Sequence, residues 1–176
     1  SKLVPAPAFR IVGAHSDSPC LKVKAESETV VAGCAKVCIE VYGGPIHSTW
    51  LDRPLSLAGR AVVKTGRHAT ETHLVDLKKP VAIIPNLAIH LNREVNTAFE
   101  YNKQNHLPLI LGNAREDKKP LLPQLVAQAL GLKDPAALQA LELYAYAAEP
   151  ASLAGANGEF FSSGRIDNLA ACHAIH

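Results

Sequence analysis

The stretch Phe9-Arg10-Ile11-Val12-Gly13-Ala14-His15-Ser16-Asp17-Ser18-Pro19 decides how the rest of the chain is interpreted. The run from Ile11 to Ala14 is unbroken by polar residues, which is typical of a strand buried on both faces. His15 and Asp17 follow two positions apart, and in an extended backbone such side chains lie on the same face. A carboxylate there can hold one imidazole N–H while the other ring nitrogen faces a metal ion. The alternative is a strand end with a surface histidine and a turn-forming aspartate, and spacing alone leaves both open.

Length and composition indicate an ordinary globular protein. The chain has 176 residues, of which 48% are hydrophobic and 19% are charged. The net charge of +2 and the aromatic content of 5% do not indicate a surface that binds nucleic acid. No apolar run approaches the roughly 20 residues that span a bilayer, so no membrane partner is expected. The four cysteines form no CxxC pair, which favours reduced thiols and a cytoplasmic location. They are Cys20, Cys34, Cys38 and Cys172.

Two features of the sequence indicate an internal piece of a longer protein. There is no methionine, so the chain has no natural initiator. The apolar helical pattern from Leu169 to His176 also has no C-cap or breaker after it. We therefore expect further residues of the same protein outside this chain.

The middle of the chain, residues 25–149, is rich in predicted strands with short connections. Alternation of apolar and polar residues predicts strands at 21–25, 36–42, 55–63 and 71–78, with weaker apolar strands at 81–84 and 107–111. Short helices are predicted at 87–91, 121–130 and 136–141, and residues 142–149 alternate again. Near the end, Asn157-Gly158 predicts a hairpin and a last helix begins near Asp167. This order predicts an α/β fold in which the chain leaves one sheet at 1–24, builds an inserted strand-rich unit at 25–149, and returns at 150–176.

A second candidate for metal chemistry lies in the returning segment. Asp167 follows Gly164-Arg165-Ile166 and precedes the apolar helical pattern. Aspartate at such a place commonly caps a helix by accepting a backbone N–H. The alternative is a carboxylate that bridges two metal ions about 3.5–4 Å apart, which share a water molecule and polarise a carbonyl. Both interpretations stay open on the residues alone.

The remaining histidines carry no HExxH spacing and are expected at the surface or in hydrogen bonds. His90 stands among apolar neighbours and is expected, from those neighbours alone, to be partly buried and hydrogen-bonded. A surface or hydrogen-bonding role is expected for His47, His68, His73, His173 and His176.

Six blocks of sequence, in order, resemble the aspartyl aminopeptidase family of dinuclear zinc metalloaminopeptidases. Each block is short, but together they extend over nearly the whole chain. The blocks are residues 12–24 around His15, Glu40-Val41-Tyr42-Gly43-Gly44, Ser48-Thr49-Trp50-Leu51-Asp52-Arg53, Leu55-Ser56-Leu57-Ala58-Gly59-Arg60, Ile84-Pro85-Asn86-Leu87-Ala88-Ile89-His90-Leu91, and Glu159-Phe160 with Gly164-Arg165-Ile166-Asp167-Asn168-Leu169.

The resemblance implies a function and a role for four residues. It implies a hydrolase that uses two zinc ions, for which Mn or Co can substitute, to remove amino-terminal and especially acidic residues from peptides. His15 would bind one zinc, Asp17 would orient His15, and Asp167 would bridge both ions, followed by a peptide bond that is often cis. His90 would lie in an inserted dimerisation domain and contact substrate in the neighbouring subunit. The partners implied are a peptide substrate and further copies of the chain, as dimers or dodecameric shells.

The resemblance also implies that part of the site lies beyond His176. A Glu-Glu pair that supplies the general base and a ligand, a later Asp and a final His are absent, so this chain alone is expected to bind zinc poorly and to be inactive. Two alternatives remain. One is a catalytically silent family member that acts as an oligomeric scaffold or cargo-binding protein. The other is a related shell-forming aminopeptidase with a different insert and specificity.

Overall fold

The computed structural model describes residues 8–117 and 119–176, and it divides the chain into two compact units. The first unit comprises the residues up to 18 together with 150–176, and the second comprises 19–149. The sequence predicts the corresponding boundaries at 24/25 and 149/150. The first boundary lies earlier in the structure because residues 20–31 form one continuous strand of the second unit.

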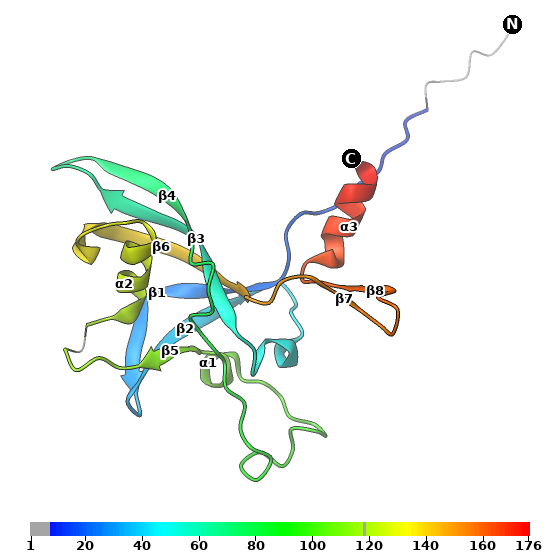
Figure 1. Ribbon diagram of the computed structural model, residues 1–176, viewed down its shortest axis with the longest axis horizontal. Coiled ribbons are helices and arrows are strands. Elements are labelled where there is room, and N and C mark those ends of the chain that lie inside the picture. Colours follow the sequence, from blue (N-terminus) through cyan, green and yellow to red (C-terminus); the bar gives the residue numbers. More distant parts are fainter. Residues whose placement is uncertain (1–7, 118) are drawn as a thin grey trace, which may run out of the picture. The chain divides into compact units, whose positions relative to one another are not determined.

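The second unit is built on one six-stranded antiparallel sheet with the order β4-β3-β6-β1-β2-β5 (Figure 1). The late strand β6 lies between β1 and β3, so the unit is closed by pairing between residues far apart in sequence. The strands are β1 (Cys20–Val31), β2 (Cys34–Tyr42), β3 (Leu55–Lys64), β4 (Thr70–Asp76), β5 (Leu109–Asn113) and β6 (Leu138–Ala147). The short helices are η1 (His47–Trp50), α1 (Lys103–His106), α2 (Leu121–Ala129) and η2 (Pro135–Ala137).

One face of the sheet forms the hydrophobic core, as the alternation in the sequence predicts. In β1, Leu21 and Val23 are buried while Lys22 between them is not, and β2 alternates in the same way. In β3 the alternation holds from Ala61 to Lys64, whereas residues 55–57 are all buried. Leu122 and Val126 of α2 join the same core. The predicted strands at 21–25, 36–42, 55–63 and 71–78 and the helix at 121–130 are therefore confirmed.

The other face of β3, β6 and β1 carries a polar network centred on Glu142. Its carboxylate accepts hydrogen bonds from Tyr144 Oη at 2.9 Å and Lys22 Nζ at 3.3 Å, and it pairs with Arg60. Arg60 lies directly opposite Glu142, Lys22 is its diagonal neighbour opposite Tyr144, and Tyr144 lies two residues along β6 on the same face. These hydrogen bonds hold the pKa of Glu142 below its usual value, and the one from Tyr144 has the largest effect.

The start of helix α2 is capped from another element. Its first residue follows Pro120, which cannot cap through a side chain. The carboxylate of Glu28 in β1 instead accepts hydrogen bonds from the N–H groups of Leu121 at 2.6 Å and Leu122 at 2.8 Å. A negative charge at a helix N-terminus satisfies free donors and interacts favourably with the helix dipole. Glu28 therefore fixes α2 to the sheet that α2 covers.

Three predictions for the second unit need correction. Residues 87–91 form no helix but an irregular stretch with a turn at 89–91, and Asn86 accepts from the adjacent N–H of Leu87. Asp134 does cap Ala136, but the helix ends at Ala137 because Leu138 onward pairs with β3. The predicted strand at 81–84 is reduced to isolated bridges of residues 82 and 83.

The first unit contains the hairpin of β7 (Ser152–Ala154) and β8 (Phe160–Ser162) and the helix α3 (Ile166–Ile175). The predicted hairpin and last helix are confirmed. The prediction of a doubly buried strand at 11–14 is wrong for this chain, where Ile11 is 91% exposed. A buried strand needs neighbours, and within residues 8–117 and 119–176 no strand pairs with 11–14. No helix in this described part is long and apolar enough to cross a bilayer.

Removal of the Glu28 carboxylate tests its capping role. Glu28→Ala is expected to lower the free energy of unfolding by about 0.5–2 kcal/mol, because two N–H donors of α2 lose their acceptor. Glu28→Gln, which keeps one amide oxygen, should lose less. Denaturant unfolding provides the measurement, and Glu116→Ala, which removes an exposed charge, provides the control. Equal stability of Glu28→Ala and this control would show that the cap contributes nothing.

Candidate metal centre

His15 lies in the irregular segment before β1, with Asp17 on one side of its ring. Its Nδ1 is 3.1 Å from Asp17 Oδ1 and 3.0 Å from the Asp17 backbone oxygen. Because both partners are acceptors, the contact places a proton on Nδ1, so Nε2 is the ring nitrogen that could bind a metal ion. The predicted contact between these two side chains is confirmed, although the backbone that brings them together is not a paired strand.

Asp167 faces the free nitrogen of the same ring. Its Oδ1 lies 3.4 Å from His15 Nε2, although 167 − 15 = 152 positions separate the residues. The helix α3 begins at Ile166 with Arg165 before it and no side-chain cap, and Asp167 itself has non-helical angles of φ −83° and ψ 110°. The peptide bond from Asp167 to Asn168 is cis, as the resemblance implies. The Asp167 carboxylate faces His15 Nε2.

The spacing of these two donor atoms fits a zinc ion. Zinc bonds to nitrogen and oxygen of about 2.0–2.1 Å in a tetrahedral arrangement place neighbouring donors about 3.3–3.4 Å apart. The side chains are 53% and 94% exposed, so both could accept a ligand without prior rearrangement of a core. Across residues 8–117 and 119–176, no group of three or more His, Cys, Asp or Glu side chains is arranged for a metal ion. The described chain therefore offers an imidazole and a carboxylate as one pair.

Two further side chains connect the segments that carry this pair. Ser18 Oγ donates a hydrogen bond to the backbone oxygen of Asp167 at 3.3 Å. Cys172 Sγ donates one to the backbone oxygen of His15 at 3.2 Å. Sequence analysis assigned neither residue a role in the site. Their separation from these partners, 149 and 157 positions, leaves no local pattern that could have shown it.

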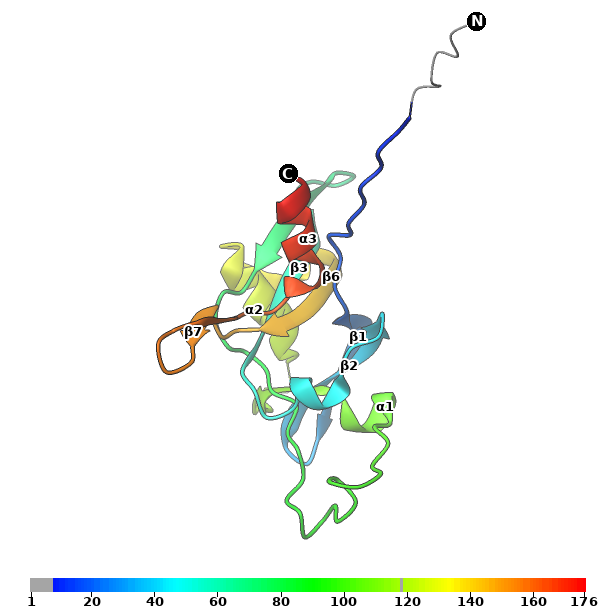
Figure 2. The ribbon, with the colours of Figure 1, turned by 90° about the vertical axis from the view of Figure 1, so that its right-hand side faces the viewer.

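The other histidines stay outside this arrangement. His47 and His73 are half-buried, next to the Tyr101 ring and Glu71 respectively, and His68 is exposed. His90 is also exposed, which corrects the expectation from its neighbours that it is partly buried. Those neighbours lie at the surface too, since residues 86–102 form a long loop without helix or strand (Figure 2).

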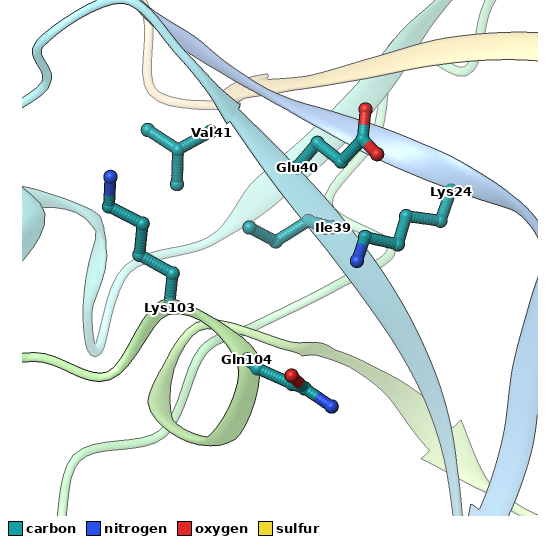
Figure 3. A pocket seen from close by; sticks show the side chains of 6 residues that line it. All are labelled: Lys24, Ile39, Glu40, Val41, Lys103 and Gln104. Carbon is teal, nitrogen blue, oxygen red and sulfur yellow. The ribbon is translucent and has the colours of Figure 1, made fainter.

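The second unit has a surface pocket that is unrelated to these residues. It is lined by Lys24, Ile39, Glu40 and Val41 from β1 and β2, and by Lys103 and Gln104 from α1 (Figure 3). Two lysines, a carboxylate and an amide surround it, so it combines both charges with an apolar floor. It contains no histidine or cysteine, and no pattern from the sequence points to it.

Comparison with known proteins identifies relatives over almost the whole chain. The probable M18 family aminopeptidase 2 of Pseudomonas putida (strain KT2440) is 46% identical over 170 residues, which are 94% of this chain and 39% of that protein. The protein of the same description from Stutzerimonas stutzeri (strain A1501) is 44% identical over 170 residues. The chain thus spans about 39% of the length of the curated relatives it matches.

Solved structures share the fold. A cryo-EM structure of the Ape4 and Nbr1 complex matches with a TM-score of 0.80 and 35% identity over 89% of this chain and 33% of that chain. Chaetomium thermophilum mApe1 matches with a TM-score of 0.77 and 30% identity over 89% of this chain and 38% of that chain. The sequence profile of the family described as aminopeptidase I zinc metalloprotease (M18) matches residues 1–176. Because that match extends from the first residue to the last, the chain belongs to the M18 family of zinc metalloproteases.

Proposed function

We propose that the complete protein is a zinc-dependent aminopeptidase and that this chain supplies part of its metal centre. The observation that carries the proposal is the placement of His15 Nε2 3.4 Å from Asp167 Oδ1. Asp17 occupies the other ring nitrogen and so keeps Nε2 available as an acceptor.

The residues of the pair take different roles in this proposal. His15 would hold one of two zinc ions through Nε2, and Asp167 would contribute its carboxylate to both ions. Asp17 does not touch the metal but orients the His15 ring. When bound, the metal ions supply a polarised carbonyl and an activated water molecule at neutral pH. Mn or Co can take the place of zinc at such oxygen and nitrogen donors.

The chain alone would be an incomplete enzyme. Catalytic zinc sites keep three protein ligands, and the described residues offer an imidazole and one carboxylate. We expect the other ligands and the general base in the part of the protein outside these 176 residues, because the curated relatives are longer. The chain by itself should therefore bind zinc weakly and hydrolyse no peptide.

Substrate, assembly and location follow from family resemblance. Similarity to aspartyl aminopeptidases favours acidic amino-terminal residues. The chain would act in the cytoplasm as a dimer or a larger shell, and a mApe1 structure of the same fold is a dodecamer. The exposed loop of residues 86–102 supports contact between subunits, since Leu87, Ile89 and Leu91 expose apolar surface around His90. In such an assembly His90 would contact substrate at the neighbouring active site.

Replacement of His15 tests the metal centre in the full-length protein. His15→Ala should weaken zinc binding by more than about 100-fold, because loss of an outer partner alone costs about 10–100-fold. Zinc content and hydrolysis of Asp-, Glu- and Leu-anilides should fall together, while His68→Ala should leave both unchanged. An unaltered zinc content would contradict the assignment. A wild-type protein that assembles but neither binds zinc nor hydrolyses these compounds would favour the silent scaffold.

The 176-residue chain itself gives a second comparison. In a competition with a chelator, it should bind zinc at least about 100-fold more weakly than the full-length protein, because ligands are missing. The Asp167→Asn variant of the short chain should bind still less. Equal affinity of the short and full-length wild-type chains would show that the site is complete within these residues.

The role of His90 can be tested by mixing subunits. His90→Ala should lower turnover by about 100-fold with zinc content intact, as expected when one substrate contact is removed. In mixed oligomers of His90→Ala and His15→Ala, the first variant supplies the metal centre and the second supplies His90. Activity should therefore reappear on mixing, and mixtures that stay inactive would show that His90 serves no neighbouring site.

A further inference from the structure

The two predicted metal ligands are anchored through their backbones by side chains of the opposite segment. Ser18, three residues after His15, holds the Asp167 carbonyl. Cys172, five residues after Asp167, holds the His15 carbonyl. The contacts are therefore reciprocal, with one hydrogen bond from each segment to the ligand-bearing residue of the other.

We propose that Ser18 and Cys172 are positioning residues that set the distance between His15 and Asp167. The inference rests on the proposed function, because it assigns these contacts to a metal centre. Neither residue binds the metal in this assignment. Each acts only through the ligand whose backbone it holds.

Side-chain packing cannot set that distance here. The imidazole is about half exposed and the Asp167 carboxylate is almost fully exposed, so neither is confined by a core. An exposed ion pair contributes little by itself, since its median worth is about 0–1 kcal/mol. What remains to hold residues 152 positions apart at 3.4 Å is the backbone and the groups that fix it.

The chemistry of the two contacts leaves the ligand atoms available. Both acceptors are main-chain oxygens, so neither contact uses His15 Nε2 or an Asp167 carboxylate oxygen. The Cys172 Sγ contacts a main-chain oxygen, whereas a cysteine that binds a metal ion does so directly through its sulfur. This separates Cys172 from the ligands despite its closeness to them.

The test measures zinc affinity of the full-length protein by chelator competition, together with the visible spectrum of its Co²⁺ form. Cys172→Ala and Ser18→Ala should each weaken zinc binding about tenfold, the size typical for an outer partner of a ligand. They should also alter the Co²⁺ spectrum, because the ligand geometry changes. Cys172→Ser differs from Cys172→Ala mainly by its hydroxyl, which can donate the hydrogen bond. Its zinc affinity should therefore be close to that of the wild type.

Matched controls separate positioning from general stability. Ser163→Ala removes a hydroxyl in the same unit whose hydrogen bond goes only to adjacent Gly164, and Cys34→Ala removes a half-buried thiol of the second unit. Both should bind zinc as wild type does. Metal-free melting temperatures should match across all variants, so that an affinity change reports on the site.

The outcomes distinguish this inference from the proposed function. If His15→Ala loses zinc but Cys172→Ala and Ser18→Ala bind it normally, the positioning role is wrong and the metal centre stands. If Cys172→Ser is as weak as Cys172→Ala, donation by residue 172 is not what matters and the inference fails. If wild type and His15→Ala bind zinc equally, the proposed metal centre fails and this inference fails with it.

Discussion

The antiparallel pairing of β1 with β6 is the constraint on which the rest of the chain depends. Leu21, near the start of the second unit, lies opposite Ala145, near its end. The two ends of the second unit therefore lie side by side, although about 130 residues lie between them. Without this closure the segments that carry His15 and Asp167 would be the ends of a long flexible loop. The entropy of closing such a loop would then oppose their contact.

The sheet that provides this closure is largely predictable because its signals are local. Alternation places Leu21 and Val23 on the buried face, and every correctly predicted strand carries the same period. The predicted elements are wrong where the local preference of a segment conflicts with its pairing in the sheet. Asp134-Pro135 starts a helix as predicted, but pairing of Leu138 onward with β3 ends it after one turn. The cap of α2 by Glu28 also escapes prediction, since donor and acceptor lie 93 positions apart.

In the candidate site, too, the local contact is predictable from the sequence and the long-range contact is not. The contact of His15 with Asp17 follows from a two-residue spacing and could be expected. That Asp167 would face the same ring could be suggested only by family resemblance, because no sequence period extends over 152 positions. The buried strand at 11–14 was wrongly predicted for a related reason. An apolar run such as Ile11-Val12 shows that a segment suits burial, but burial itself depends on which neighbours are present.

The first unit combines exposed apolar side chains with a few exposed polar contacts. A bound metal ion would therefore affect the stability of this unit. Hydrogen bonds and ion pairs at such exposed positions contribute about 1 kcal/mol or less each, so the ordering of residues 15–18 against α3 costs free energy that these contacts barely offset. A ligand that binds only the ordered arrangement stabilises it by mass action, and the stabilisation grows with the logarithm of the ligand concentration over its dissociation constant. Zinc held by His15 and Asp167 would therefore act on folding as well as on catalysis. In the proposed enzyme, order in the segment before β1 would then depend on metal occupancy, whereas the sheet of the second unit, with its own buried core, would not.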